Sequence, residues 1–394
     1  MRTVDLFSGC GGMSLGFQSA GYNIVAAFEN WPAAIECYEQ NFKHPVIETD
    51  LSVVEEAVAL IKKYKPDLII GGPPCQDFSN AGNRTEGERA ELTHSFAKIV
   101  TAVKPKFFVM ENVARASESE AYKKAKKLFV DNGYGLTEIV LDASHCNVPQ
   151  KRNRFFCIGG LNQEDGFLSA TLKAKQTVLP LSVRDYYSEK KYNLEFEHYY
   201  RHPRSYKRRG IFSVDTPAPT IRGVNRPKPS EYKKHESDPV DPANVRAMTT
   251  RERARIQTFP DTFVFPENVA NTEQMIGNAV PVQLAAFVAS SLSDFVKGKQ
   301  YSCDMQFIDW LKSSKGFTTR AAGDIVSRII RANKIIPIKQ HSVSDYIGRL
   351  DNAKSFESIK PAVQSQVKRA VRLYFEYLNI SKKELEVTSH GSGT

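Results

Sequence analysis

The chain has 394 residues, of which 41% are hydrophobic and 25% charged, a balance typical of a soluble globular protein with material for two or three domains. Its formal net charge of +10 favours an anionic partner, most often nucleic acid, over the alternative of a basic enzyme that binds no polyanion. No apolar run approaches the ~20 residues of a membrane span and a strand-like pattern begins at the N-terminus, so we expect a cytoplasmic protein with neither a membrane segment nor a signal peptide.

Strand-like and helix-like segments alternate along the first 160 residues. The expected strands cover residues 3–7, 22–30, 44–50, 66–72, 105–113, 136–143 and 154–160. Helices are expected between them, at residues 32–42, 53–64, 95–104 and 122–134. Such alternation predicts an α/β fold, a doubly wound and mostly parallel sheet with helices on both faces.

The remaining chain changes character twice. Residues 161–260 mix aromatic, proline and basic residues, which predicts a smaller, irregular, partly β domain with a basic face. Regular structure then returns, and residues 261–298 are expected to carry a helix back to the first domain (residues 1–160). Residues 299–394 read as a helical C-terminal extension of amphipathic helices, with Thr318 and Ser342 as N-caps.

Three features place chemistry at the carboxyl ends of the expected strands, where doubly wound sheets bind ligands. The first is the glycine loop "DLFSGCGG" at residues 5–12, a weak signal alone because its spacing is not G-x-G-x-x-G. The second is a set of polar strand ends: Glu29 for ribose hydroxyls, Trp31 for stacking on adenine, and Asp50 for an amino group. Together they indicate an adenosine-bearing cofactor without a pyrophosphate.

The third feature is one thiol. Cys75 follows two prolines in "GGPPCQDFSNAG", in a loop at the ligand-binding edge, and Glu111 in "ENV" ends the fifth strand. A thiolate is a strong nucleophile where its surroundings favour it, and a nearby carboxyl can act as an acid. None of the six cysteines forms a C-x-x-C pair, so we expect no metal site, and most of them should be core residues.

Six motifs occur in a fixed order: "DLFSGCGG", "GGPPCQDFSNAGNR", "ENV", "QKRNRFF", "TTRERARIQTFPD" and "GNAVPVQLA". In this order they resemble the motif set of the cytosine carbon-5 DNA methyltransferases. The resemblance spans residues 3–294, with a variable gap between the fourth and fifth motifs, and leaves the C-terminal extension outside. One departure is Asn30, which separates Glu29 from Trp31 where family members often have the acid and the tryptophan adjacent.

The resemblance implies a mechanism. Cys75 would add to carbon 6 of cytosine, carbon 5 would take the methyl group of S-adenosyl-L-methionine, and loss of the carbon-5 proton would expel the cysteine. Glu111 would contact ring nitrogen 3 and the amino group, while Arg152 and Arg154 would hold the base and the adduct. Because carbon 5 is inaccessible inside a duplex, the base must leave the stack.

The resemblance also implies two further sets of residues. The cofactor pocket would be lined by Phe7, Gly9, Gly11, Glu29, Trp31, Asp50, Leu51, Pro74, Asn278 and Val280. DNA would be contacted by the loop after the thiol and by the basic region of the second domain, through Gln76, Ser79, Arg84, Arg201, Arg204, Lys207, Arg208 and Arg209.

We therefore expect a monomeric bacterial DNA (cytosine-5-)-methyltransferase, from a restriction-modification system or an orphan counterpart. In a restriction-modification system it would protect a specific duplex sequence from a cognate restriction endonuclease, linked in function rather than bound. The alternatives are a transfer-RNA cytosine-5 methyltransferase, disfavoured by the large recognition-like insert, and a catalytically silent DNA-binding regulator, disfavoured by the intact Cys75 and Glu111. A nucleotide-dependent oxidoreductase lacks its dinucleotide fingerprint. The extension is left open, as either a DNA-holding or a protein-contact module.

Overall fold

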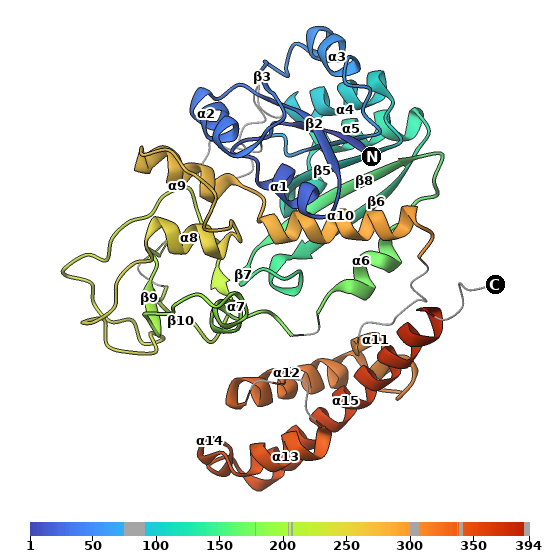
Figure 1. The fold of residues 1–394 in the computed structure, drawn as a ribbon. Helices are drawn as coiled ribbons and strands as arrows, with labels where there is room; N and C mark the ends of the chain where they lie inside the picture. The colour runs from blue at the N-terminus through green and yellow to red at the C-terminus, as the bar shows by residue number, and fades with distance from the viewer. Residues whose placement is uncertain are drawn as a thin grey trace. The chain divides into compact units, whose positions relative to one another are not determined.

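The structure is a computed structural model that describes residues 1–74, 91–177, 179–203, 205, 208–299, 307–336, 338 and 342–389. By packing, the chain divides into two units, Met1–Gln300 and Tyr301–Thr394. Figure 1 shows a sheet flanked by helices in the first unit and helices in the second. These are the predicted fold class and helical extension, and both are confirmed.

Seven strands form the central sheet of the first unit: β1 (Arg2–Leu6), β2 (Asn23–Glu29), β3 (Val46–Glu48), β4 (Leu68–Gly71), β5 (Phe107–Val113), β6 (Tyr134–Asp142) and β8 (Asn153–Leu161). Their order across the sheet is β3-β2-β1-β4-β5-β8-β6. The pairs from β3 to β5 are parallel, whereas β8 is antiparallel to both β5 and β6. The sheet is therefore mostly parallel, with an antiparallel edge.

Helices cover both faces of this sheet (Figure 1). One face carries α3 (Val54–Lys62), α4 (Glu91–Val103) and α5 (Glu120–Asp131), whose apolar residues join one buried cluster with the strands. The other face carries α1 (Gly12–Ser19), α6 (Ser169–Lys175) and α10 (Val282–Val296), which share a second cluster. Because both faces are covered, a strand such as β4 is buried throughout and reads as a continuous apolar run.

The strand order places a topological switch point beside β1. From β1 the chain runs outward to β2 and β3 on one side, and then crosses to β4 on the other. The connections that leave β1 and β4 therefore diverge, and we call the place outside the carboxyl ends of these two strands the crevice. Doubly wound sheets bind ligands at such a point.

Helix α10 packs directly on α1. A Cβ atom added at Gly16 would lie 2.5 Å from the Cβ of Ala285, and the Tyr22 hydroxyl donates to the Ala289 carbonyl at 3.1 Å. The stretch Val269–Val296, formed by α9 (Val269–Asn278) and α10, is long and apolar enough to cross a membrane, but more than half of its most apolar window is buried. Packing in the core accounts for its apolar character.

Short elements make up the rest of the first unit. They are η2 (Ala114–Glu118), η3 (Ala143–His145), β7 (Gln150–Lys151), α7 (Val183–Lys190), β9 (His198–Tyr200), β10 (Ile211–Ser213), β11 (Ala218–Pro219) and α8 (Thr250–Ile256), with α2 (Pro32–Asn41) beside the sheet. The pair β9–β10 is antiparallel and β11 pairs in parallel with β7. Buried tyrosines of this region join the same cluster as residues of α2 and α9.

Four cysteines, Cys10, Cys37, Cys146 and Cys157, are unpaired thiols buried in the core. Burial raises the pKa of each of them above the ordinary thiol range. They behave as small apolar residues, as the sequence predicted. The other two, Cys75 and Cys303, lie outside the described residues.

The second unit is helical and has its own core. It contains α11 (Phe307–Ser313), α12 (Thr319–Ile335), α13 (Val343–Asp351), α14 (Lys354–Glu357) and α15 (Pro361–Ser389). The predicted N-caps are confirmed, because the side chains of Thr318 and Ser342 accept from backbone N–H groups three residues on. Buried Tyr346, Phe356 and Val371 belong to its apolar cluster.

Candidate active site

The glycine loop after β1 forms one wall of the crevice. Phe7, Gly9 and Gly11 all adopt positive φ angles, of 55°, 53° and 92°. This conformation is uncommon for a bulky residue such as Phe7 and marks a constrained backbone. The Glu29 carboxylate at the end of β2 accepts from Gly9 N–H at 2.7 Å and from Trp31 N–H at 3.0 Å. Two predicted cofactor segments are thus tied together at adjacent strand ends.

The crevice has unsatisfied polar atoms of the kind that a polar ligand would satisfy. Ser8 Oγ and Thr49 Oγ1 are buried, and neither has a hydrogen-bond partner among the described residues. A Cβ atom added at Gly9 would meet no described atom within 4 Å, so there is space above the loop. Asp50 is exposed, Leu51 is buried beside it, and Ser52 N–H donates to Asp50 at 2.9 Å. The donors, acceptors and open space fit an adenosine-bearing cofactor.

A chain of hydrogen bonds runs behind this loop. Ser14 Oγ donates to Asp5 at 2.7 Å, and the Tyr38 hydroxyl donates to Ser14 Oγ at 2.6 Å. The same hydroxyl lies 2.7 Å from His44 Nε2. Burial raises the pKa of Asp5 to about 7, and the hydrogen bond from Ser14 only partly offsets that rise.

The turn after α9 closes the crevice from the C-terminal side. Asn278 ends α9 and is exposed, while Val280 is 8% exposed. A Cβ atom added at Gly12 would lie 2.6 Å from the Val280 carbonyl oxygen. Only glycine allows this approach, so the turn rests directly on the glycine loop.

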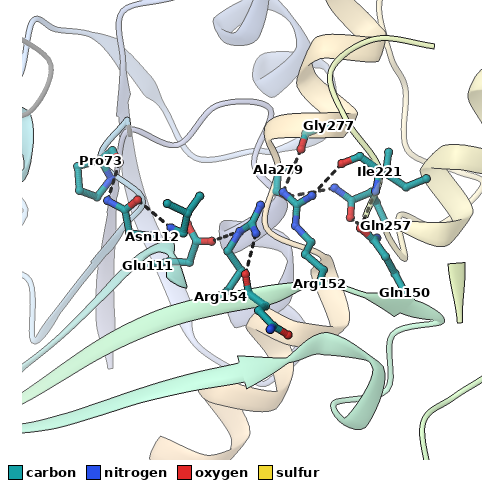
Figure 2. A network of polar contacts seen from close by, with 12 residues as sticks. Pro73, Glu111, Asn112, Gln150, Arg152, Arg154, Ile221, Gln257, Gly277 and Ala279 are labelled. Atoms are coloured by element: carbon teal, nitrogen blue, oxygen red, sulfur yellow. Dashed lines mark hydrogen bonds and ion pairs between the residues drawn. The ribbon is translucent and has the colours of Figure 1, made fainter. Parts of the chain in front are cut away.

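The segment that leads to the thiol lies against β5. A Cβ atom added at Gly72 would lie 3.1 Å from Glu111 Oε2, and Asn112 Nδ2 donates to the Pro73 carbonyl at 3.3 Å (Figure 2). Pro74 is exposed at the end of this segment. Cys75 follows it directly and lies outside the described residues. The structure therefore brings the segment just before Cys75 against the predicted acid, Glu111.

Glu111, which is buried, and Arg154, which is partly buried, form an ion pair on the neighbouring strands β5 and β8. Arg154 Nε lies 2.8 Å from Glu111 Oε1 (Figure 2). Burial raises the pKa of Glu111, and the positive charges of Arg154 and Arg152 oppose that rise. A carboxyl with a raised pKa beside a guanidinium can both donate a proton and hold a polar ring, which suits an acid that activates a base.

Arg152, predicted beside Arg154 in the catalytic set, has a different environment. It is 1% exposed, and its guanidinium donates to the backbone carbonyls of Ile221 at 2.9 Å and of Gly277 at 2.9 Å (Figure 2). Burial lowers its pKa well below the usual arginine value, and the charge of Arg154 lowers it further. Arg152 therefore ties two backbone segments together, and its part in catalysis stays a prediction.

The profile of the C-5 cytosine-specific DNA methylase family matches residues 1–294. The chain belongs to this family. It is 57% identical over 300 residues to the type II methyltransferase M.HindV of Haemophilus influenzae, and this alignment covers 75% of this chain and 98% of that protein. It is also 53% identical over 297 residues to the type II methyltransferase M.HgiDI of Herpetosiphon aurantiacus, covering 75% of this chain and 95% of that protein.

Solved structures agree on the fold of this cytosine DNA methylase. The Dnmt2 methyltransferase of S. pombe aligns with a TM-score of 0.55 at 19% identity, over 76% of this chain and 99% of that one. The methyltransferase EhMeth of Entamoeba histolytica aligns with a TM-score of 0.53 at 17% identity, over 77% and 99%. The predicted family, fold and cytosine-C5 DNA methylation are confirmed, and membership implies S-adenosyl-L-methionine as the methyl donor.

The predicted DNA-contacting residues of this cytosine DNA methylase fall into two groups. Arg201, Arg208 and Arg209 are described: Arg201 donates to the Thr220 carbonyl at 2.8 Å, and the Arg209 guanidinium lies 4.7 Å from the ring centre of Phe212. Arg208 and Arg209 are exposed. The others, Gln76, Ser79, Arg84, Arg204 and Lys207, lie outside the described residues.

The sequence did not predict a pocket that the structure shows between residues 199 and 253. This pocket, which we call the arginine pocket, is lined by Arg201, Arg222 and Arg226 together with Tyr200, His202 and Val224. Arg226 and Val224 are exposed, and Val224 is 64% exposed. The letters "TIRGVNRPKP" signalled basic character, but nothing in them indicated that residues 201 and 226 line one pocket.

Proposed function

We propose that the chain transfers a methyl group from S-adenosyl-L-methionine to carbon 5 of a flipped-out cytosine in a specific duplex sequence, through a covalent adduct of Cys75. The observation that carries the proposal is the ion pair between the buried Glu111 and the partly buried Arg154, placed against Gly72 three residues before the thiol. Cysteine, acid and arginine are the groups that activation of a cytosine ring requires.

In the proposed reaction, covalent addition to the cytosine ring precedes methyl transfer. The Cys75 thiolate forms a bond to carbon 6, and the ring electrons gather at carbon 5, while Glu111 holds ring nitrogen 3 and the amino group and Arg154 holds Glu111. When bound, the cofactor would supply an electrophilic methyl group, and S-adenosylhomocysteine would leave with the electron pair of the broken sulfur–methyl bond. Carbon 5, once alkylated, loses its proton to a solvent base, and the electron pair of that bond re-forms the double bond between carbons 5 and 6. The bond between carbon 6 and the Cys75 sulfur then breaks, and the thiolate leaves with the bonding pair.

The cofactor is proposed to lie in the crevice beside β1. Phe7, Gly9, Gly11 and Val280 form the walls, Glu29 holds the ribose, and Trp31, Asp50 and Leu51 surround the adenine. Pro74 and Asn278 complete the set. The unsatisfied Ser8 Oγ and Thr49 Oγ1 support a polar ligand at this place.

DNA is proposed to bind through the loop after Cys75 and the basic residues between 161 and 260, including the arginine pocket. We also propose that residues 1–160 form the catalytic and cofactor-binding domain and residues 161–260 the target-recognition domain. Residues 261–298 would return to the catalytic domain, and residues 299–394 would form the helical extension. The relatives are named type II methyltransferases, which supports a function in protecting DNA from a cognate restriction endonuclease.

A covalent trap tests this mechanism. Duplex DNA carrying 5-fluorocytosine at the target, incubated with the native chain and cofactor, should yield a complex that survives denaturing electrophoresis, because fluorine does not leave as a proton does. Cys75→Ala should give no complex and no methylation while it still binds DNA, whereas Cys303→Ala should behave as the native chain. Methyl transfer by Cys75→Ala, or transfer to transfer RNA but not to duplex DNA, would overturn the proposal.

A further inference from the structure

Gln150, Arg152 and Gln257 form a buried group that we call the glutamine–arginine cluster. All three side chains are 0–1% exposed, and Gln150 Nε2 donates to Gln257 Oε1 at 2.7 Å (Figure 2). Buried polar groups of this size require partners, because an unpaired one costs free energy. The cluster finds its partners on two separate backbone segments.

The first segment is the start of the arginine pocket. Ile221 N–H donates to Gln150 Oε1 at 2.9 Å, and the Ile221 carbonyl accepts from Arg152 Nη1 at 2.9 Å. The next carbonyl, that of Arg222, accepts from Arg253. The backbone that leads into the pocket residues Arg222 to Arg226 is therefore held at consecutive polar groups.

The second segment is the turn that closes the cofactor crevice. Arg152 Nη2 donates to the carbonyls of Gly277 at 2.9 Å and Ala279 at 3.2 Å. Gln257 Nε2 donates to Ala279 at 3.0 Å and also to Ile276. This turn carries Asn278 and Val280, and it rests on the glycine loop at Gly12.

The two segments also touch each other. A Cβ atom added at Gly277 would lie 2.1 Å from Gly223 N, so the backbones are in direct contact. A guanidinium is a planar fork with fixed donor directions. A shift of Ile221 therefore has to move Arg152 or break its bond, and either event disturbs the carbonyls of Gly277 and Ala279.

We infer that the glutamine–arginine cluster couples target binding at residues 221–226 to cofactor binding at the 277–280 turn, so that each ligand raises the affinity for the other. The inference rests on the proposed function, which places DNA and cofactor at these two segments. Such coupling is reciprocal, and a factor of roughly 5–150 is typical.

Binding of S-adenosylhomocysteine tests the coupling without turnover. Calorimetry would give its Kd for the free protein and for the protein saturated with target duplex. The native chain should bind about 5–150-fold more tightly with duplex present. Gln150→Met, which removes the acceptor of Ile221 N–H, should bring this ratio toward one. Thr137→Val is the matched control: it removes the buried acceptor of Leu168 N–H, 3.0 Å away, and should keep the native ratio.

Arg152→Lys provides a second variant, since it keeps a positive charge and removes the fork. A native ratio of one, or an unchanged ratio in both variants with native melting behaviour, would overturn the coupling and leave the methyltransferase proposal intact. A native chain that binds S-adenosylhomocysteine but neither binds nor methylates duplex DNA would overturn both.

Discussion

Asp5 lies at one end of the polar chain behind the glycine loop, bound by Ser14, and is 1% exposed. Its pKa of about 7 lies well above the ~3.9 of an unfolded chain. Between these pH values the folded state holds a proton that the unfolded state has lost, so the free energy of unfolding falls as pH rises. The stabilisation is complete below about pH 4 and is lost as pH rises through about 7.

Asp5→Asn should remove this pH dependence, because the amide still accepts from Ser14 and does not titrate. Relative to the variant, the native chain should lose up to about 1.4 kcal/mol of unfolding free energy per pH unit between these values. Urea unfolding at pH 5, 6 and 7 measures the difference. The exposed Asp131→Asn serves as control, and a constant gap between native and Asp5→Asn at all three pH values would contradict the prediction.

Asp50 carries a prediction about the cofactor. Its carboxylate is exposed at the crevice and accepts a hydrogen bond from the backbone N–H of Ser52. If it accepts from the adenine amino group, Asp50→Ala should weaken S-adenosyl-L-methionine binding by about 1–3 kcal/mol, the usual cost of an unpaired donor. Calorimetry should show this loss for Asp50→Ala but not for Glu56→Ala on α3, and equal affinities would remove Asp50 from the pocket.

Two helical glycines, Gly16 in α1 and Gly323 in α12, should respond in opposite ways to substitution by alanine. A Cβ atom at Gly16 would lie 2.5 Å from both the Ala285 Cβ and the Val282 carbonyl oxygen, so Gly16→Ala forces the helices apart. Overpacking of this kind costs about 1–3 kcal/mol. Gly323→Ala in α12 meets no described atom within 4 Å and should instead stabilise its helix by about 0.5–1 kcal/mol. Chemical denaturation of both variants decides, and the same sign for both would show that helix propensity outweighs packing.

Elements were predictable from the sequence where the signal was local. The period of the apolar residues gave the strands near residues 3–7 and 105–113, and the caps Thr318 and Ser342 mark helix starts in both sequence and structure. Pairing was not predictable, because a period says that a strand exists and not which neighbour it takes. Hence β8 enters between β5 and β6 although it follows both in the chain.

The site shows the same division. Cys75, Glu111 and the strand-end acids stand in recognisable motifs, whereas Gln150 and Gln257 are 107 residues apart and meet only in the folded chain. No sequence pattern around a glutamine indicates that its side chain will be buried. Arg152 likewise donates to three backbone carbonyls that are distant from it in the sequence.

At the scale of the whole molecule, the second unit lies beyond the family match and has its own core. We therefore expect that a chain ending at Lys297 folds and methylates the same sequence as the full chain, which bisulfite sequencing of exposed DNA would show. An insoluble or inactive truncation would place residues 299–394 within the catalytic fold.

The charge of this extension predicts its effect on DNA binding. Residues 301–394 contain 15 Lys and Arg against 9 Asp and Glu. If these cations contact phosphates, the truncated chain should bind duplexes of any sequence more weakly and with a flatter dependence on salt. Fluorescence anisotropy across a salt series measures both quantities. Unchanged affinity and slope would favour a protein-contact module.

The buried thiols make the chain suitable for selective labelling. Cys10, Cys37, Cys146 and Cys157 are shielded from solvent and kept as thiols by burial, so an alkylating dye at neutral pH should react with them only slowly. Any rapid labelling should therefore occur at Cys75 or Cys303. In a Cys303→Ser chain, the rate of dye incorporation would report on the nucleophile alone, so that its accessibility could be followed in real time as cofactor and DNA arrive.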